Sequence, residues 1–193
     1  MPKLVHPDRS PLFETLTTLH LDHWGKPSPS GNLWELSITI SPWEETDGKL
    51  LTLEQYPTVQ TLVNELRNPA SHRRYRHKGV LVTSSPGIGK TSCLWYLLVT
   101  ALCAAEPVIL LYDSSLFIIT KSGVYKLSSA NDAQVVEHGA FTGVLCLVDL
   151  DDDTSPIHKA VLSRNSQCFT VAASSPQCKR YQDWVTRLRI TTS

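Results

Sequence analysis

The chain has 193 residues with 18 basic and 18 acidic side chains, so its formal net charge is zero. This length suits one domain, or one domain with a short appendage, and the 41% of apolar residues excludes a disordered chain. The zero charge excludes a global electrostatic attraction to nucleic acid or to an anionic membrane, so such a partner would have to meet a local patch.

The first part of the chain, residues 1–48, is a weakly patterned lead-in. Its loop "GKPSPSGN" is followed by "LWELSITI", Leu33 to Ile40, where apolar and polar residues alternate as in a strand. Trp24, Trp34 and Trp43 carry large apolar side chains, so we expect this segment to dock on the core of the protein. We predict a short β-containing appendage over 1–48 and a core domain over 49–193.

Two features precede the core. Apolar residues at helical spacing predict a helix over Thr52 to Leu66, with Pro57 in its first turn. The basic run "HRRYRHK", His72 to Lys78, reads most simply as a solvated connector. Two alternatives stay open for this run: a nuclear-import or nucleic-acid patch, and a basic wall near a bound nucleotide.

From Gly79 onward the pattern becomes regular. "GVLVT" predicts a buried strand, Lys90 to Ala105 a buried helix, "PVILLYD" a second strand, and "SLFIITKSGVYKL" a hairpin that turns at Lys121-Ser122-Gly123. "GVLCLVDLDDD" and "CFTVAASSP" predict two further buried strands, and "QCKRYQDWVTRL" has helical spacing. Buried strands that alternate with helices predict an α/β fold with a parallel sheet flanked by helices.

The stretch "SSPGIGKTS", between the first strand and the first core helix, is typical of a phosphate-binding P-loop. Gly87 and Gly89 let the backbone wrap around a ligand, the amides of residues 87–91 form an anion nest, Lys90 neutralises phosphate, and Thr91 offers a hydroxyl to Mg²⁺. The alternative is a glycine-rich turn without a ligand. Ser84 departs from the pattern G-x-x-x-x-G-K-[ST], but the residues nearest the phosphates are intact. The residues predicted to bind the nucleotide are Ser84, Ser85, Gly87, Ile88, Gly89, Lys90, Thr91 and Ser92.

The acid at the end of the third predicted strand, Asp149, is the candidate second ligand of Mg²⁺, although "DLDDDTSP" also reads as a surface turn. Many P-loop ATPases with an added strand carry Glu directly after this Asp, and here Leu150 occupies that position, so Asp151 is the nearest substitute. Ser174 ends the fourth strand and either senses the terminal phosphate or is an ordinary strand-end serine. The candidate catalytic residues are therefore Lys90, Asp149, Asp151 and Ser174. The candidates for further charge stabilisation are Arg164, Arg180, Arg187 and Arg189.

Composition bears on location. The five cysteines form no C-x-x-C pair and lie mostly in apolar runs, which favours reduced buried thiols over a disulfide framework or a zinc site. The N-terminus has no uninterrupted apolar core, so a secretory signal is not supported. Glu106-Pro107 interrupts the apolar run Leu94 to Leu111, which favours a buried helix and strand over a membrane span. We expect an intracellular protein, cytoplasmic or nuclear, without a membrane partner.

The chain contains, in this order, the motifs "LTLEQY…VQTLVNEL", "KGVLVTSSPGIGKTSCLWYLLVTAL", "VILLYDSSLFIITKSGVYKL", "LCLVDLDDD" and "AASSPQCKRYQDWV". Through these motifs it resembles the P-loop NTPase-like proteins of fungal genomes that are related to Crinkler effectors and retrotransposon hot spot proteins. The resemblance covers about Leu51 to Val185. It implies an ATPase-like core that drives or regulates an attached effector domain, and a metal-binding Asp without a following Glu. It also implies a further strand that begins near "RLRITTS", so we expect either a domain that is incomplete at its C-terminal end, as a fragment or shortened gene product, or a reduced nucleotide-binding module.

Two functions remain as hypotheses. The first is a P-loop protein that binds ATP, or GTP, with Mg²⁺ and hydrolyses it weakly or only with a partner. The second is a non-catalytic, nucleotide-gated module that binds another protein, or nucleic acid through the basic run. A small-molecule or nucleotide kinase is a distant third, because no acceptor site is evident. No motif in the sequence selects between adenine and guanine.

Overall fold

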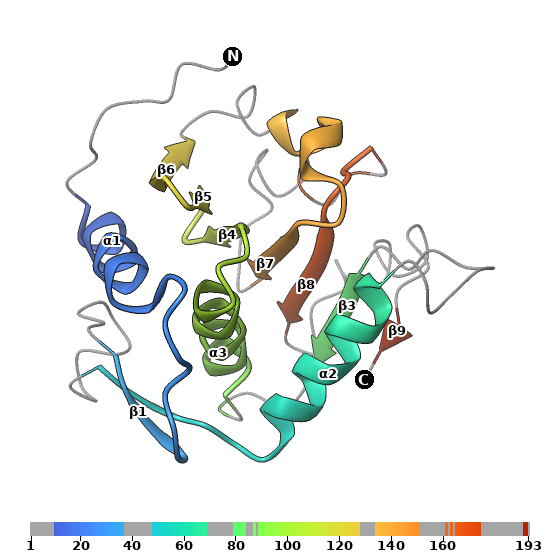
Figure 1. Cartoon of the computed structure of the whole chain (residues 1–193). Coiled ribbons are helices and arrows are strands. Elements are labelled where there is room, and N and C mark those ends of the chain that lie inside the picture. Colours follow the sequence, from blue (N-terminus) through green and yellow to red (C-terminus); the bar gives the residue numbers. More distant parts are fainter. Residues whose placement is uncertain are drawn as a thin grey trace.

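A computed structural model describes residues 10–36, 48–68, 79–83, 87, 89–127, 134–150, 161, 163, 165–174 and 191–192 (Figure 1). Its helices are α1 (Pro11–His23), α2 (Gln55–Arg67) and α3 (Lys90–Cys103), with the 3-10 helices η2 (Gln134–Glu137) and η3 (Gly139–Phe141). Its strands are β1 (Leu33–Glu35), β2 (Lys49–Leu51), β3 (Gly79–Thr83), β4 (Val108–Tyr112), β5 (Ser115–Thr120), β6 (Gly123–Leu127), β7 (Leu145–Asp149), β8 (Phe169–Ser174) and β9 (Thr191–Thr192).

The main sheet is mixed, in the order β6-β5-β4-β7-β8-β3-β9. Strands β4, β7, β8, β3 and β9 run parallel, as the sequence predicts, and β9 lies where a further strand is expected to begin. The prediction of a parallel sheet is wrong at one edge, where the predicted hairpin, β5 and β6, joins the sheet by antiparallel pairing of β5 with β4. Only Asp113 and Ser114 join β4 to β5, both with positive φ (48° and 55°), and a two-residue turn permits only antiparallel pairing.

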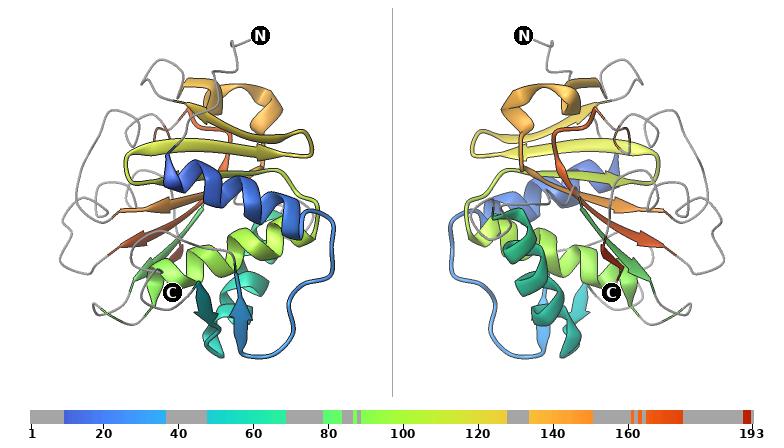
Figure 2. Two further views of the ribbon diagram at one scale, coloured as in Figure 1. Left: turned by 90° about the vertical axis from the view of Figure 1, so that its left-hand side faces the viewer. Right: turned by 90° about the vertical axis from the view of Figure 1, so that its right-hand side faces the viewer.

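The two faces of the sheet carry separate apolar clusters because side chains alternate along each strand. Leu145 and Leu147 of β7 face the helical side, whereas Cys146 and Val148 face the other. Helices α1, α2 and α3 lie on the first face, and η2 and η3 lie toward the second (Figures 1 and 2). Helix α3 is buried along most of its length, as its uninterrupted apolar sequence predicts.

The first face also holds the N-terminal elements. The sequence analysis does not predict the helix between Pro11 and His23, where Ser10 caps α1 and Leu16 and Leu19 are fully buried against the core. The expected docking is confirmed for Trp34, whose ring stacks on Tyr96 of α3 at a centroid distance of 4.9 Å. Strand β1 pairs with β2 across the predicted boundary at residue 48, and that boundary stays a prediction.

Several other expectations can be compared with the structure. The helix with Pro57 in its first turn is confirmed as α2, and the hairpin after β4 is confirmed as β5–β6. Four of the cysteines are described and none of them forms a disulfide. Within the described ranges, every helix is too short or too polar to cross a bilayer. The basic run 72–78, the predicted helix over 177–188 and part of the predicted strand, residues 37–40, lie outside the described residues.

Candidate functional site

The predicted phosphate loop lies between β3 and α3. Gly87 and Gly89 both adopt left-handed backbone conformations, with φ of 82° and 78°, that disfavour any residue with a side chain. Gly89 is the N-cap of α3, and its carbonyl accepts the first helical hydrogen bond from the Cys93 amide at 2.9 Å. Ser84, Ser85 and Ile88 lie outside the described residues.

The first two residues of α3 are Lys90 and Thr91, and both side chains are partly exposed. The amides of a helix's first turn have no carbonyl partner within the helix and carry its partial positive charge. A cationic and a hydroxyl side chain therefore stand at the positive end of a buried helix. This geometry suits an anion, in the way that the P-loop pattern implies.

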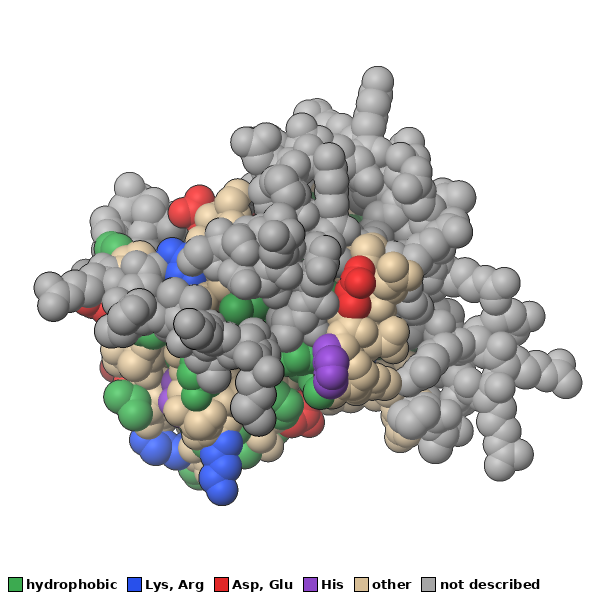
Figure 3. Space-filling model, turned by 90° about the horizontal axis from the view of Figure 1, so that it is seen from above, with side chains coloured by type: hydrophobic (Ala, Val, Ile, Leu, Met, Phe, Trp, Pro, Cys, Tyr) green, Lys and Arg blue, Asp and Glu red, His purple; other side chains and the backbone are tan. Residues whose placement is uncertain are grey.

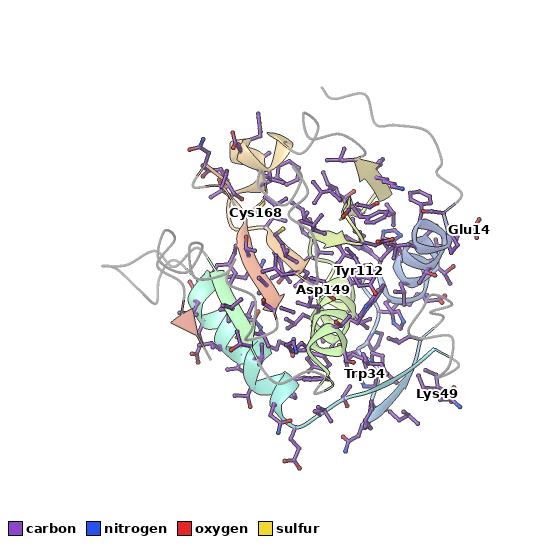
Figure 4. All side chains as sticks on the ribbon, turned by 180° about the vertical axis from the view of Figure 1, so that it is seen from behind. Glu14, Trp34, Lys49, Tyr112, Asp149 and Cys168 are labelled. Carbon is purple, nitrogen blue, oxygen red and sulfur yellow. The ribbon has the colours of Figure 1, made fainter. Side chains whose placement is uncertain are left out.

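The central contact of the site joins Thr91 to Asp149. The Thr91 hydroxyl donates a hydrogen bond to Oδ2 of Asp149 at 2.8 Å, although the two residues are 58 positions apart. Asp149 is the last residue of β7, and Figure 4 shows it close to α3. The structure thus brings together the two side chains that the sequence, on independent grounds, predicts as ligands of Mg²⁺.

The chemistry of this pair fits Mg²⁺. A hydroxyl and a carboxylate are the oxygen ligands that Mg²⁺ prefers, and this ion usually keeps several waters and binds phosphate oxygens as well. In the described part of the chain no group of three or more His, Cys, Asp or Glu side chains could hold a metal by itself. Two protein oxygens leave the remaining coordination positions of Mg²⁺ to water and phosphate.

Leu150, at the position where many P-loop ATPases carry a water-orienting Glu, points away from this pair. Its amide donates to the Ala173 carbonyl at 2.9 Å, which continues the pairing of β7 with β8, and its side chain packs on the cluster of the second face. Asp149 and Thr91 lie on the first face. Asp151, the suggested substitute, and the four candidate arginines (Arg164, Arg180, Arg187 and Arg189) lie outside the described residues.

Ser174 ends β8 beside Thr83 of β3, and its neighbour Ala173 pairs with Asp149. The residue therefore lies between the strands that carry the loop and the acid, as predicted. Its side chain is fully buried, and the alternation along β8 places it on the face of Ala172, opposite to Asp149. A role in sensing phosphate stays a prediction.

Tyr56 of α2 is a residue of the site that sequence reasoning missed. Its hydroxyl donates to the Gly89 carbonyl at 2.8 Å across 33 positions. Burial raises the pKa of Tyr56, and a side-chain hydrogen bond with Ser92 opposes part of this shift. In the sequence this tyrosine is one of several apolar residues at helical spacing, so no local pattern marks it.

The charges on the molecular surface are mixed. On the face shown in Figure 3, acidic and basic side chains of the described residues are scattered without forming one large patch of either sign.

No protein-family model matches the sequence, and no curated protein matches it either. The chemistry of the site therefore rests on the residues of this chain alone.

Proposed function

We propose that the chain is a P-loop NTPase-like protein that binds ATP, or GTP, together with Mg²⁺. The observation that carries this proposal is the hydrogen bond between the Thr91 hydroxyl and the Asp149 carboxylate. It unites the helix start of a Gly-x-Gly-Lys-Thr loop with an acid that ends a neighbouring buried strand. Lys90 and the loop amides would bind phosphate, and Thr91 and Asp149 would hold Mg²⁺, which supplies further neutralisation of phosphate charge.

The strand order supports the same function. Strands β3 and β7 are parallel to β8, which lies between them, so the loop after β3 and Asp149 at the end of β7 meet at one edge of the sheet. Ligands of open α/β sheets bind outside the carboxyl ends of the strands. A strand inserted between the loop strand and the acid strand is also typical of P-loop ATPases with an added strand, and this support is an analogy of fold.

Hydrolysis is proposed to be weak or to need a partner. The position after Asp149 is occupied by Leu150, which packs on the second face of the sheet, so it offers no carboxylate that could orient water. The same observation favours a second candidate function, a nucleotide-gated module that binds a protein partner or an attached effector domain without turnover. We also propose that the chain is related to the fungal Crinkler-related proteins and that it is intracellular.

Titration with ATP and GTP, with and without Mg²⁺, tests the proposal. We expect saturable binding by the wild-type chain and its loss in a folded Lys90→Ala variant, because this substitution removes the cation that faces the phosphates. Equal affinity of the two proteins would refute the proposed site. Steady-state phosphate release then separates the two candidates, since turnover that depends on Lys90 would exclude the module without catalysis.

A further inference from the structure

The Gly89 carbonyl has two hydrogen-bond donors. The Cys93 amide donates to it from within α3 at 2.9 Å, and the Tyr56 hydroxyl donates to it from α2 at 2.8 Å. A carbonyl oxygen has two lone pairs, so these two donors use its full capacity and determine its direction. The orientation of the peptide unit between Gly89 and Lys90 is therefore held from two sides.

This peptide unit also contains the Lys90 amide. A peptide bond is planar and trans, so the Lys90 N–H points opposite to the Gly89 carbonyl. Because the carbonyl accepts from Tyr56 and from Cys93 in the next turn of α3, the N–H is directed away from both, past the N-terminal end of α3. It is one of the first amides of α3, whose partner must come from outside the helix.

Tyr56 is itself held in place. Its side chain is only 4% exposed, and its ring lies against that of Tyr96 at a centroid distance of 5.6 Å. Tyr96 in turn stacks on Trp34 and donates its hydroxyl to Gln60 at 2.9 Å. Trp34 belongs to β1, so this aromatic row joins α2, α3 and β1; Trp34 is labelled in Figure 4. The Tyr56 hydroxyl is thus a rigid donor, and its raised pKa keeps it protonated.

We propose that Tyr56 is a positioning residue for phosphate binding, which acts by holding the Gly89 carbonyl so that the Lys90 amide is directed at the ligand. This inference rests on the proposed function and adds a residue to it. Gly89 supports the same arrangement, since a Cβ there would lie 2.5 Å from the Tyr56 hydroxyl oxygen. Glycine thus meets two needs at this position, a left-handed backbone and the close approach of the tyrosine.

The test compares Tyr56→Phe with Tyr96→Phe. Each removes one hydroxyl that donates a hydrogen bond within the same aromatic row, but only that of Tyr56 reaches the loop. Calorimetric titration with Mg²⁺ and ATP is expected to show a loss of affinity of roughly 2- to 10-fold in Tyr56→Phe, the range that one hydrogen bond supports. Tyr96→Phe is expected to bind like the wild type. In the ligand-free proteins, the NMR resonance of the Lys90 amide is expected to shift in Tyr56→Phe only.

Two results would overturn the inference: unchanged affinity in Tyr56→Phe, or an equal loss in both variants, which would reduce Tyr56 to a contributor to packing. Failure of the wild-type chain to bind nucleotide would remove the proposed function and this role with it. The ligand-free Lys90 resonance distinguishes the two failures, because it reports the orientation of the peptide whether or not nucleotide binds.

Discussion

The hydrogen bond between Thr91 and Asp149 should stabilise the ligand-free protein, and a double-mutant cycle measures by how much. Hydrogen bonds to charged groups contribute about 1.5–3 kcal/mol, and both side chains here are partly exposed, so we expect a coupling energy of about 1–2 kcal/mol. Thr91→Val retains the branched shape without the hydroxyl, and Asp149→Ala removes the acceptor. For a chain of this length, a loss of that size lowers the melting temperature by roughly 2–8 °C.

The assay is urea unfolding of the wild type, both single variants and the double variant, in EDTA and without nucleotide. The slope of the transition should stay constant, so that the midpoints report stability. We predict that the second substitution costs much less in the presence of the first. Additivity within about 0.5 kcal/mol would refute the energetic link between the loop and the strand, because residues in contact should couple.

Three other predictions concern the stability of the fold. Gly89→Ala should lower the melting temperature more than Gly87→Ala, because a Cβ at Gly87 meets open space whereas one at Gly89 meets another side chain; equal shifts would contradict this. Trp34→Ala should lower the free energy of unfolding in urea by roughly 3–5 kcal/mol, whereas Leu33→Ala, at a side chain 54% exposed, should lower it by less than about 1 kcal/mol. Similar losses in the two variants would contradict the docking of β1 on the core through Trp34. Burial raises the pKa of Cys168 from 9.0 to about 11, so its protonated thiol stabilises the fold below pH 9, and this contribution is lost as the pH rises to 11. The fall in stability over this range should be shallower in Cys168→Ala, and an unchanged slope would contradict it.

The loop and the acid could be predicted from sequence because each has a local signature. The pair of glycines before Lys90 and Thr91 comes after an apolar strand, and Asp149 ends another. Carboxyl ends of parallel strands gather at one edge of a sheet, so the two were expected to meet, and their hydrogen bond at 2.8 Å confirms that they do.

The features that sequence reasoning missed depend on tertiary contacts or on weak local signals. The hairpin of β5 and β6 is evident from the sequence, but the turn at Asp113 and Ser114 lacks the Asn-Gly signature of a two-residue hairpin, so the antiparallel pairing of β4 with β5 is not. The contact between Tyr56 and Gly89 depends on how α2 docks. Helix α1 did have a start signal, Ser10 followed by Pro11, but its apolar residues form only a short stripe.

The most direct test of the nucleotide site is a map of backbone amide shifts on addition of Mg²⁺ and ADP to the wild-type chain. We predict that the largest changes fall on Gly87, Gly89, Lys90 and Thr91, where the loop amides would bind phosphate, with a further change at Asp149. Saturation with the largest shifts elsewhere, or no shift at these amides, would contradict the proposed site.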